Sequence, residues 1–122
     1  LDGKLYAVGG YSNDGVVLSS VEGYDPALDA WEAVAPMAAE RINLGVEGLG
    51  GKLYAMGGYG DDDDFLNSVE RYDPATNAWE AVAPMAAERI NLGVEGLGGK
   101  LYAMGGYGDD DDFLNSVERY DP

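Results

Sequence analysis

Short runs of apolar and β-forming residues alternate along the chain with clusters of Gly, Pro, Asp and Asn. In the central part four such runs follow one another, each as long as a short strand. They cover residues 44–49, 52–57, 68–72 and 79–82, which we name strands a, b, c and d. The pattern predicts short antiparallel strands, with one helical turn at most in the intervening segment 35–44.

This pattern repeats with a period of 48 residues. Residues 27–74 match residues 75–122 at all but two positions, 28 and 29, whereas residues 1–26 repeat residues 49–74 more loosely. Four strands per unit in tandem predict the blades of a β-propeller, because repetition around an axis leaves few open sheet edges. The expected fold class is therefore all-β, with each blade a four-stranded antiparallel sheet.

The 122 residues hold about two and a half units, whereas a propeller has roughly four to eight blades. We expect a partial first blade in 1–34 with strands b, c and d, a complete repeat in 35–82, and a partial last blade in 83–122 with strands a, b and c. All three belong to one incomplete propeller domain. Three origins stay open: a segment of a longer propeller, a unit that oligomerises, and a designed or consensus repeat array.

Composition narrows the possible functions. Hydrophobic residues make up 46% of the chain, enough for a core, and 23 acidic against 7 basic residues give a net charge of −16. Such a surface repels nucleic acid and anionic membranes. No Cys and no His are present, which removes the commonest general base and the usual transition-metal ligands. We expect no cofactor and no membrane insertion, and the lack of Cys is compatible with a cytoplasmic location.

Several residues recur in a fixed order in each copy. Paired glycines end strand b, and a Glu-x-Tyr followed by a Trp seven residues after the Tyr spans strands c and d. The recurring residues are Gly9, Gly10, Glu22, Tyr24 and Trp31, then Gly57, Gly58, Glu70, Tyr72 and Trp79, then Gly105, Gly106, Glu118 and Tyr120. In these residues the whole chain resembles the kelch repeat. We interpret them as structural, because glycine permits positive φ and the rings pack between blades.

The resemblance implies a propeller that binds partner proteins as an adaptor or scaffold. In an antiparallel blade successive connections emerge on alternate faces, so the b–c and d–a loops share one face. That face carries residues 59–64 and 107–112 from the b–c loops, and 36–43 and 84–91 from the d–a loops. The opposite face has only glycine pairs and short DPxxxA loops. We therefore expect the partner on the first face.

Two runs of four aspartates are the least generic feature of the sequence. They are Asp61, Asp62, Asp63 and Asp64, and Asp109, Asp110, Asp111 and Asp112. Three interpretations stay open: a solvated acidic loop, a site for a basic partner surface, and a calcium site, although the spacing lacks the alternation of an EF-hand. Tyr59 and Tyr107 precede the runs, and could either grip a basic side chain or anchor the loop.

The d–a loops each contain one arginine, Arg41 and Arg89. The resemblance implies a recognition role for them, since a d–a arginine serves that purpose in the ubiquitin-ligase adaptors of the family. The alternative is that they neutralise neighbouring Asp or Glu side chains. Two other functions also stay open. One is a structural component of a large assembly, and the other is part of a propeller enzyme, such as a copper-radical oxidase, whose His and Cys would lie in other blades.

Overall fold

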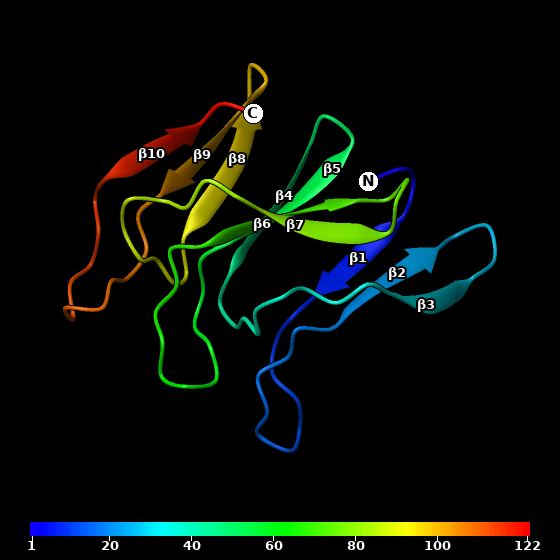
Figure 1. Cartoon of the computed structure of the whole chain (residues 1–122), viewed down its shortest axis with the longest axis horizontal. Coiled ribbons are helices and arrows are strands. Elements are labelled where there is room, and N and C mark those ends of the chain that lie inside the picture. Colours follow the sequence, from blue (N-terminus) through cyan, green and yellow to red (C-terminus); the bar gives the residue numbers. More distant parts are fainter.

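The computed structural model describes all 122 residues, which form ten strands and no helix. No segment is a helix long and apolar enough to cross a membrane. The strands make three antiparallel sheets, which follow one another across the molecule (Figure 1). Blade 1 contains β1 (Leu5–Val8), β2 (Val21–Asp25) and β3 (Ala30–Val34). Blade 2 contains β4 (Gly45–Leu49), β5 (Lys52–Met56), β6 (Val69–Asp73) and β7 (Ala78–Val82), and blade 3 contains β8 (Gly93–Leu97), β9 (Lys100–Met104) and β10 (Val117–Tyr120).

The all-β, incomplete propeller expected from the sequence is confirmed. Blade 2 has the strand order β4-β5-β6-β7, blade 1 corresponds to strands b, c and d, and blade 3 to strands a, b and c. Each strand of blade 2 begins and ends within one residue of its predicted bounds. The agreement is close because each strand is bounded by residues that favour turns, such as the pair Gly50 and Gly51, both with positive φ.

No helical turn forms in the d–a segment of residues 35–44, because its backbone amides bind other parts of the molecule. Met37 N donates to Ser19 O at 2.9 Å, and Ile42 N donates to Tyr59 O at the same distance. Ala38 N donates to a carboxylate oxygen of Glu70. The helix formers of this segment are therefore held in a non-helical conformation by contacts with blades 1 and 2, which outweigh their weak local preference.

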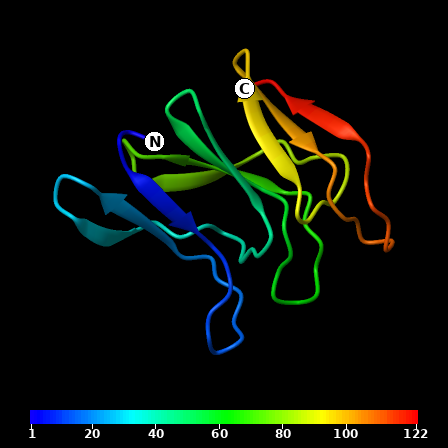
Figure 2. The same cartoon turned by 180° about the vertical axis from the view of Figure 1, so that it is seen from behind.

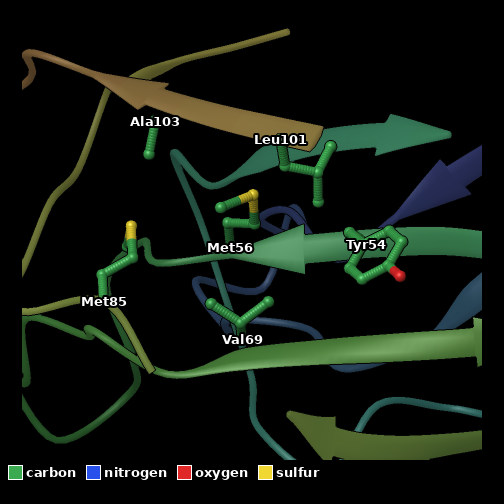
Figure 3. Close-up of a cluster of buried hydrophobic side chains, with 6 residues drawn as sticks. All are labelled: Tyr54, Met56, Val69, Met85, Leu101 and Ala103. Carbon is green, nitrogen blue, oxygen red and sulfur yellow. The ribbon is translucent and has the colours of Figure 1, made fainter. Parts of the chain in front are cut away.

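The hydrophobic core lies between the blades rather than within them. Figure 3 shows the larger cluster, in which Met56 and Val69 of blade 2 face Leu101 and Ala103 of blade 3. A smaller cluster joins Val21 of blade 1 to Ala55 of blade 2. Both clusters include a methionine from the d–a segment, Met37 or Met85. Burial of strand b in blade 2 thus depends on both neighbouring blades, since Ala55 packs toward blade 1 and Met56 toward blade 3.

The recurring aromatic residues also lie at blade junctions. Tyr72 is buried and stacks on Trp79 with ring centroids 5.2 Å apart, and Trp79 Nε1 donates to Ala35 O at 2.8 Å, across to the segment that follows blade 1. Tyr24 and Trp31 stack in the same way in blade 1, with Trp31 half exposed. Tyr120 packs against Tyr54 at 5.9 Å.

The paired glycines give a direct stability prediction. Gly57 and Gly105 both have φ of 63°, but a Cβ on Gly57 would lie 2.5 Å from Arg89 O, whereas on Gly105 its nearest neighbour would be Leu114 O at 3.3 Å. Alanine at either position should lower the free energy of unfolding by about 1–2 kcal/mol, because a residue with a Cβ disfavours the left-handed backbone conformation. Gly57→Ala should cost a further 1–3 kcal/mol or so from overpacking. Urea unfolding of both variants measures the loss of unfolding free energy. Equal losses for the two variants would show that the d–a segment moves away from the added methyl group without a free-energy cost.

Candidate functional site

The three b–c loops project to the same side of the molecule, and the glycine turns between strands a and b lie at the opposite end (Figures 1 and 2). The b–c loops occupy residues 9–20, 57–68 and 105–116 between their strands. The d–a segments pass beside them, since Ile42 pairs with Tyr59 and Ile90 pairs with Tyr107. We call the surface formed by the b–c loops and d–a segments the loop face.

In blades 2 and 3 the b–c loop ends in a closed hairpin. Tyr59 pairs with Phe65, and Gly60 N donates to Asp64 O at 2.8 Å. The Tyr59 hydroxyl donates to Asp63 Oδ1 at 2.8 Å, while Asp63 itself adopts a positive φ of 59°. The third copy repeats these contacts through Tyr107 and Asp111. The hairpin holds all four aspartates of a run on an exposed tip.

The aspartates change the chemistry of the two tyrosines. The hydrogen bond to Asp63 raises the pKa of Tyr59 above its ordinary value, with smaller contributions from burial and from nearby carboxylates. The hydrogen bond to Asp111 raises the pKa of Tyr107 in the same way. Both phenols therefore stay protonated at neutral pH and keep donating to the loop. Their hydroxyls lock the hairpins, while their rings remain available for packing.

A row of aromatic rings crosses from blade 2 to blade 3 on the loop face. Tyr59 and Phe65 lie 5.1 Å apart at 87°, Phe65 and Tyr107 lie 6.2 Å apart, and Tyr107 and Phe113 lie 5.2 Å apart. Phe113, at the end of the row, is 87% exposed. Beyond the other end, a groove of about 380 Å³ between blades 1 and 2 is lined by Tyr11, Tyr59 and aspartates of the first run. Such rings beside carboxylates can accept cationic side chains.

The loop face has no exposed positive charge of its own. The b–c loops contain neither Lys nor Arg, and the d–a segments contain only Arg41 and Arg89. The other cations lie on or beside strands, where Lys52 pairs with Asp73, Arg71 with Glu80 and Lys100 with Asp121. The aspartate runs are therefore left without cationic partners from this chain, and the loop face is strongly negative.

Arg41 lies inside the molecule instead of on the loop face. Its side chain has 0% exposure, and its guanidinium donates to Gly57 O at 2.8 Å, to Ser68 O at 3.0 Å and to Glu70 Oε2 at 2.9 Å. Its backbone meanwhile binds blade 1, since Arg41 N donates to Leu18 O. Arg41 is thus a link between blades 1 and 2.

Arg89 makes the same contacts between blades 2 and 3. Its guanidinium donates to Gly105 O, Ser116 O and Glu118 Oε2 at 2.9–3.0 Å, and its side chain is 1% exposed. Burial of Glu118 disfavours its charged form, but the amides of Ala86 and Ala87 together with Arg89 outweigh this, so the pKa of Glu118 lies below its usual value. The carboxylate stays ionised and paired.

Both arginines pair with carboxylates of this chain, as in the alternative that the sequence left open, and not with the aspartate runs. A guanidinium that is fully buried and bonded to strand ends cannot contact a partner in this arrangement, so we leave Arg41 and Arg89 out of the proposed binding surface. Glu70 and Ser68, whose side chains both accept hydrogen bonds from the Arg41 guanidinium, were missed as site residues in the sequence. The recurrence of Glu with the same spacing to Arg in each repeat is the signal that could have indicated the pairs.

The structure contains no group of three or more Asp or Glu side chains arranged to hold a metal ion. The calcium interpretation stays a prediction from the sequence.

Serial antiparallel blades with long loops on one side place the molecule in the β-propeller class. The family model for the kelch motif matches residues 1–38, 40–86 and 88–122, so the chain belongs to the kelch-repeat family. Over 39 residues it is 54% identical to Kelch-like protein 33 from Homo sapiens. This match covers 32% of the chain but only 7% of that protein. Kelch repeats in general serve as protein-interaction modules.

Proposed function

We propose that the chain is a non-catalytic interaction module whose loop face binds a basic segment of a partner protein. The observation that carries the proposal is the row of rings from Tyr59 to Phe113, flanked by exposed aspartates without cationic partners. Charged and aromatic groups in this arrangement match Lys and Arg, whose stems pack on rings while their charges meet carboxylates. The family supports a protein partner in general.

The hairpin geometry favours binding because little has to be ordered. The bonds of Tyr59 to Asp63 and of Gly60 to Asp64 fix the tip before a partner arrives. A preorganised loop loses less conformational entropy on association than a flexible one. The long-range field of the two runs would also steer a basic partner and raise its association rate. Exposed Phe113 and Tyr11 would supply the apolar contact that confers specificity.

The experiment selects ligands from a random peptide library on the wild-type chain and compares two triple variants. The loop variant carries Asp61→Asn, Asp62→Asn and Asp109→Asn, which spare the aspartates bonded to tyrosine. We expect the selected peptides to be rich in Lys and Arg, and the loop variant to bind them about tenfold more weakly or worse, because it removes the nearest opposite charges. Fluorescence anisotropy with labelled peptides measures the affinities.

The matched control removes three exposed carboxylates elsewhere, through Asp2→Asn, Glu32→Gln and Glu95→Gln. It has the same net charge as the loop variant, so a general electrostatic effect would weaken both variants equally. That outcome would contradict the loop face as the site. Selected peptides without any excess of basic residues would contradict the chemistry of the proposed partner.

A further inference from the structure

A row of three side chains crosses blade 2 on the face toward blade 3. Tyr54, Arg71 and Glu80 lie directly opposite one another on β5, β6 and β7, and Tyr54 packs against Tyr120 of blade 3. The Arg71 guanidinium donates to Glu80. Interactions with Glu80, and next with Tyr54, raise the pKa of Arg71 above its ordinary value. The arginine side chain therefore occupies the space between the ring and the carboxylate.

Blade 1 has the same row without its central side chain. Tyr6 and Glu32 lie on either side of Gly23 in the same register, and Gly23 stands where blades 2 and 3 have Arg71 and Arg119. The backbone does not require glycine here, because Gly23 is not among the residues with positive φ. A Cβ on Gly23 would lie 3.4 Å from the Tyr6 ring, an ordinary van der Waals contact. The fold could therefore hold a side chain at this position.

A pocket of about 440 Å³ lies at this row, between blades 1 and 2. Tyr6, Gly23 and Glu32 line it from blade 1, and Tyr72 lines it from blade 2, with the two tyrosine rings 6.0 Å apart. The corresponding groove between blades 2 and 3, which Arg71 lines, is smaller at about 260 Å³. The pocket lies at the end of the molecule opposite the loop face, where the β6–β7 turn is beside the first residues of the chain (Figures 1 and 2).

The pocket lining carries an excess of negative charge. Glu32 and Asp2 both line the pocket and are exposed to solvent. Lys4 is the one basic residue of the lining, and neither Lys4 nor Glu32 belongs to any ion pair of the structure. By contrast, Lys52, at the position of Lys4 in blade 2, pairs with Asp73. Two carboxylates against one ammonium favour one further cation in the pocket.

The two tyrosines supply neutral rings and acceptor oxygens. Burial is the largest cause that raises the pKa of Tyr6 and of Tyr72, and the charge of Glu32 adds to both shifts. Both phenols are therefore protonated at neutral pH. The Tyr72 hydroxyl donates to Asn77 Oδ1 at 2.9 Å, which leaves its own oxygen able to accept a hydrogen bond.

We propose that this pocket binds a guanidinium group, which takes the place of the missing arginine side chain between Tyr6 and Glu32. The occupant is defined within the chain itself, because Arg71 has the same position between Tyr54 and Glu80. A guanidinium stacks on aromatic rings and presents a planar fork of donors to a carboxylate, whereas an ammonium is a compact, strongly hydrated charge. The pocket is separate from the aspartate runs, so the inference does not depend on the proposed loop-face function.

The test titrates two guanidinium ligands into the whole chain, methylguanidinium and the tripeptide acetyl-Gly-Arg-Gly-amide. Amide NMR shifts at Gly23 and Glu32 report binding, and we expect saturation with a dissociation constant on the order of 1 mM for such small ligands. Methylammonium and acetyl-Gly-Lys-Gly-amide have the same charges and should bind about fivefold more weakly or worse. Tighter binding of the arginine tripeptide would assign the ligand to a protein side chain, and equal affinities would assign it to free guanidinium compounds.

Gly23→Arg supplies the missing side chain from the chain itself. This variant should abolish binding of both guanidinium ligands and raise the urea midpoint of unfolding. Gly23→Ala is its matched control, because it removes the same glycine without filling the pocket, and it should bind as the wild type does. Glu32→Gln should weaken binding about fivefold or more, since it removes the paired charge. Glu95→Gln, at an exposed carboxylate of blade 3, should leave the affinity unchanged.

Three results would overturn the inference. They are the absence of saturable binding, equal affinities for guanidinium and ammonium ligands, and equal effects of Glu32→Gln and Glu95→Gln. The last comparison holds even where Gly23→Arg does not fold. The loop variant with its three aspartates replaced should keep this binding, whereas the control variant for the loop face, which includes Glu32→Gln, should lose it. Failure of this proposal is therefore distinguishable from failure of the loop-face proposal.

Discussion

Replacing Arg41 by methionine should destabilise the chain by about 3–5 kcal/mol, the largest effect we expect from a single substitution. The reason is the carboxylate that it leaves behind. Glu70 has a side chain only 6% exposed, and loses its one cationic partner in the variant. Methionine fills much of the space of the arginine side chain. The loss of stability therefore comes from the unpaired carboxylate of Glu70 more than from a cavity. Urea unfolding followed by tryptophan fluorescence measures the change.

Arg89→Met is the matched control for this prediction. It removes the same contacts from the next repeat, but Glu118 is 24% exposed and can recover hydration. Its loss should therefore be smaller than that of Arg41→Met. Adding Glu70→Gln to Arg41→Met should restore part of the stability, because the variant then buries no unpaired charge. A loss below about 1 kcal/mol for Arg41→Met would contradict the linking role.

Leu101→Ala should cost about 2–5 kcal/mol, as expected for a leucine deleted from a well-packed core. Leu101 has 0% exposure and belongs to the cluster between blades 2 and 3 shown in Figure 3. The destabilisation by Leu101→Ala depends on blade 2, because Tyr54 and Met56 of that blade are in the same cluster. The loss is again measured as the free energy of unfolding in urea.

Leu5→Ala provides the comparison within the same chain. Leu5 occupies the same strand position in the repeat, but its side chain is 64% exposed, so the substitution should change stability by less than about 0.5 kcal/mol. The contrast isolates the contribution of a preceding blade, because the strand and the residue are the same. Similar losses for Leu5→Ala and Leu101→Ala would mean that each blade buries its own leucine, contrary to the structure.

The strands could be predicted because the repeat makes their boundaries explicit. Turn-forming residues such as the pair Gly50 and Gly51 separate β4 from β5, and the 48-residue period shows the same elements twice. The segment 35–44 was harder to predict. Its helix formers indicated a possible turn, but the acceptors for its amides, such as Glu70, lie about 30 residues away in the chain. A local propensity carries no information about partners at that separation.

The candidate site was predictable to a similar extent. The aspartates at the hairpin tips are as exposed as a run of four charges suggests, and Tyr59 is beside them as the sequence indicates. The hydrogen bond from Tyr59 to Asp63 and the tilted ring contact of Phe65 with Tyr107 of the next blade could not be derived from spacing. The sequence left open whether Arg41 and Arg89 recognise a partner or pair with acidic side chains, because only the neighbouring blade shows which acceptors surround them.

The sequence by itself determined the all-β class, the order of strands and the repeat family, because these follow from local turn chemistry, alternating apolar residues and a fixed period. Only the tertiary structure decided which of the equivalent residues are buried. Leu5, Leu53 and Leu101 all lie in the sequence Gly-Lys-Leu-Tyr-Ala, yet their exposure depends on whether another blade packs against them. Burial is a property of neighbours brought together by the fold, and in a repeat protein those neighbours come from the adjoining unit.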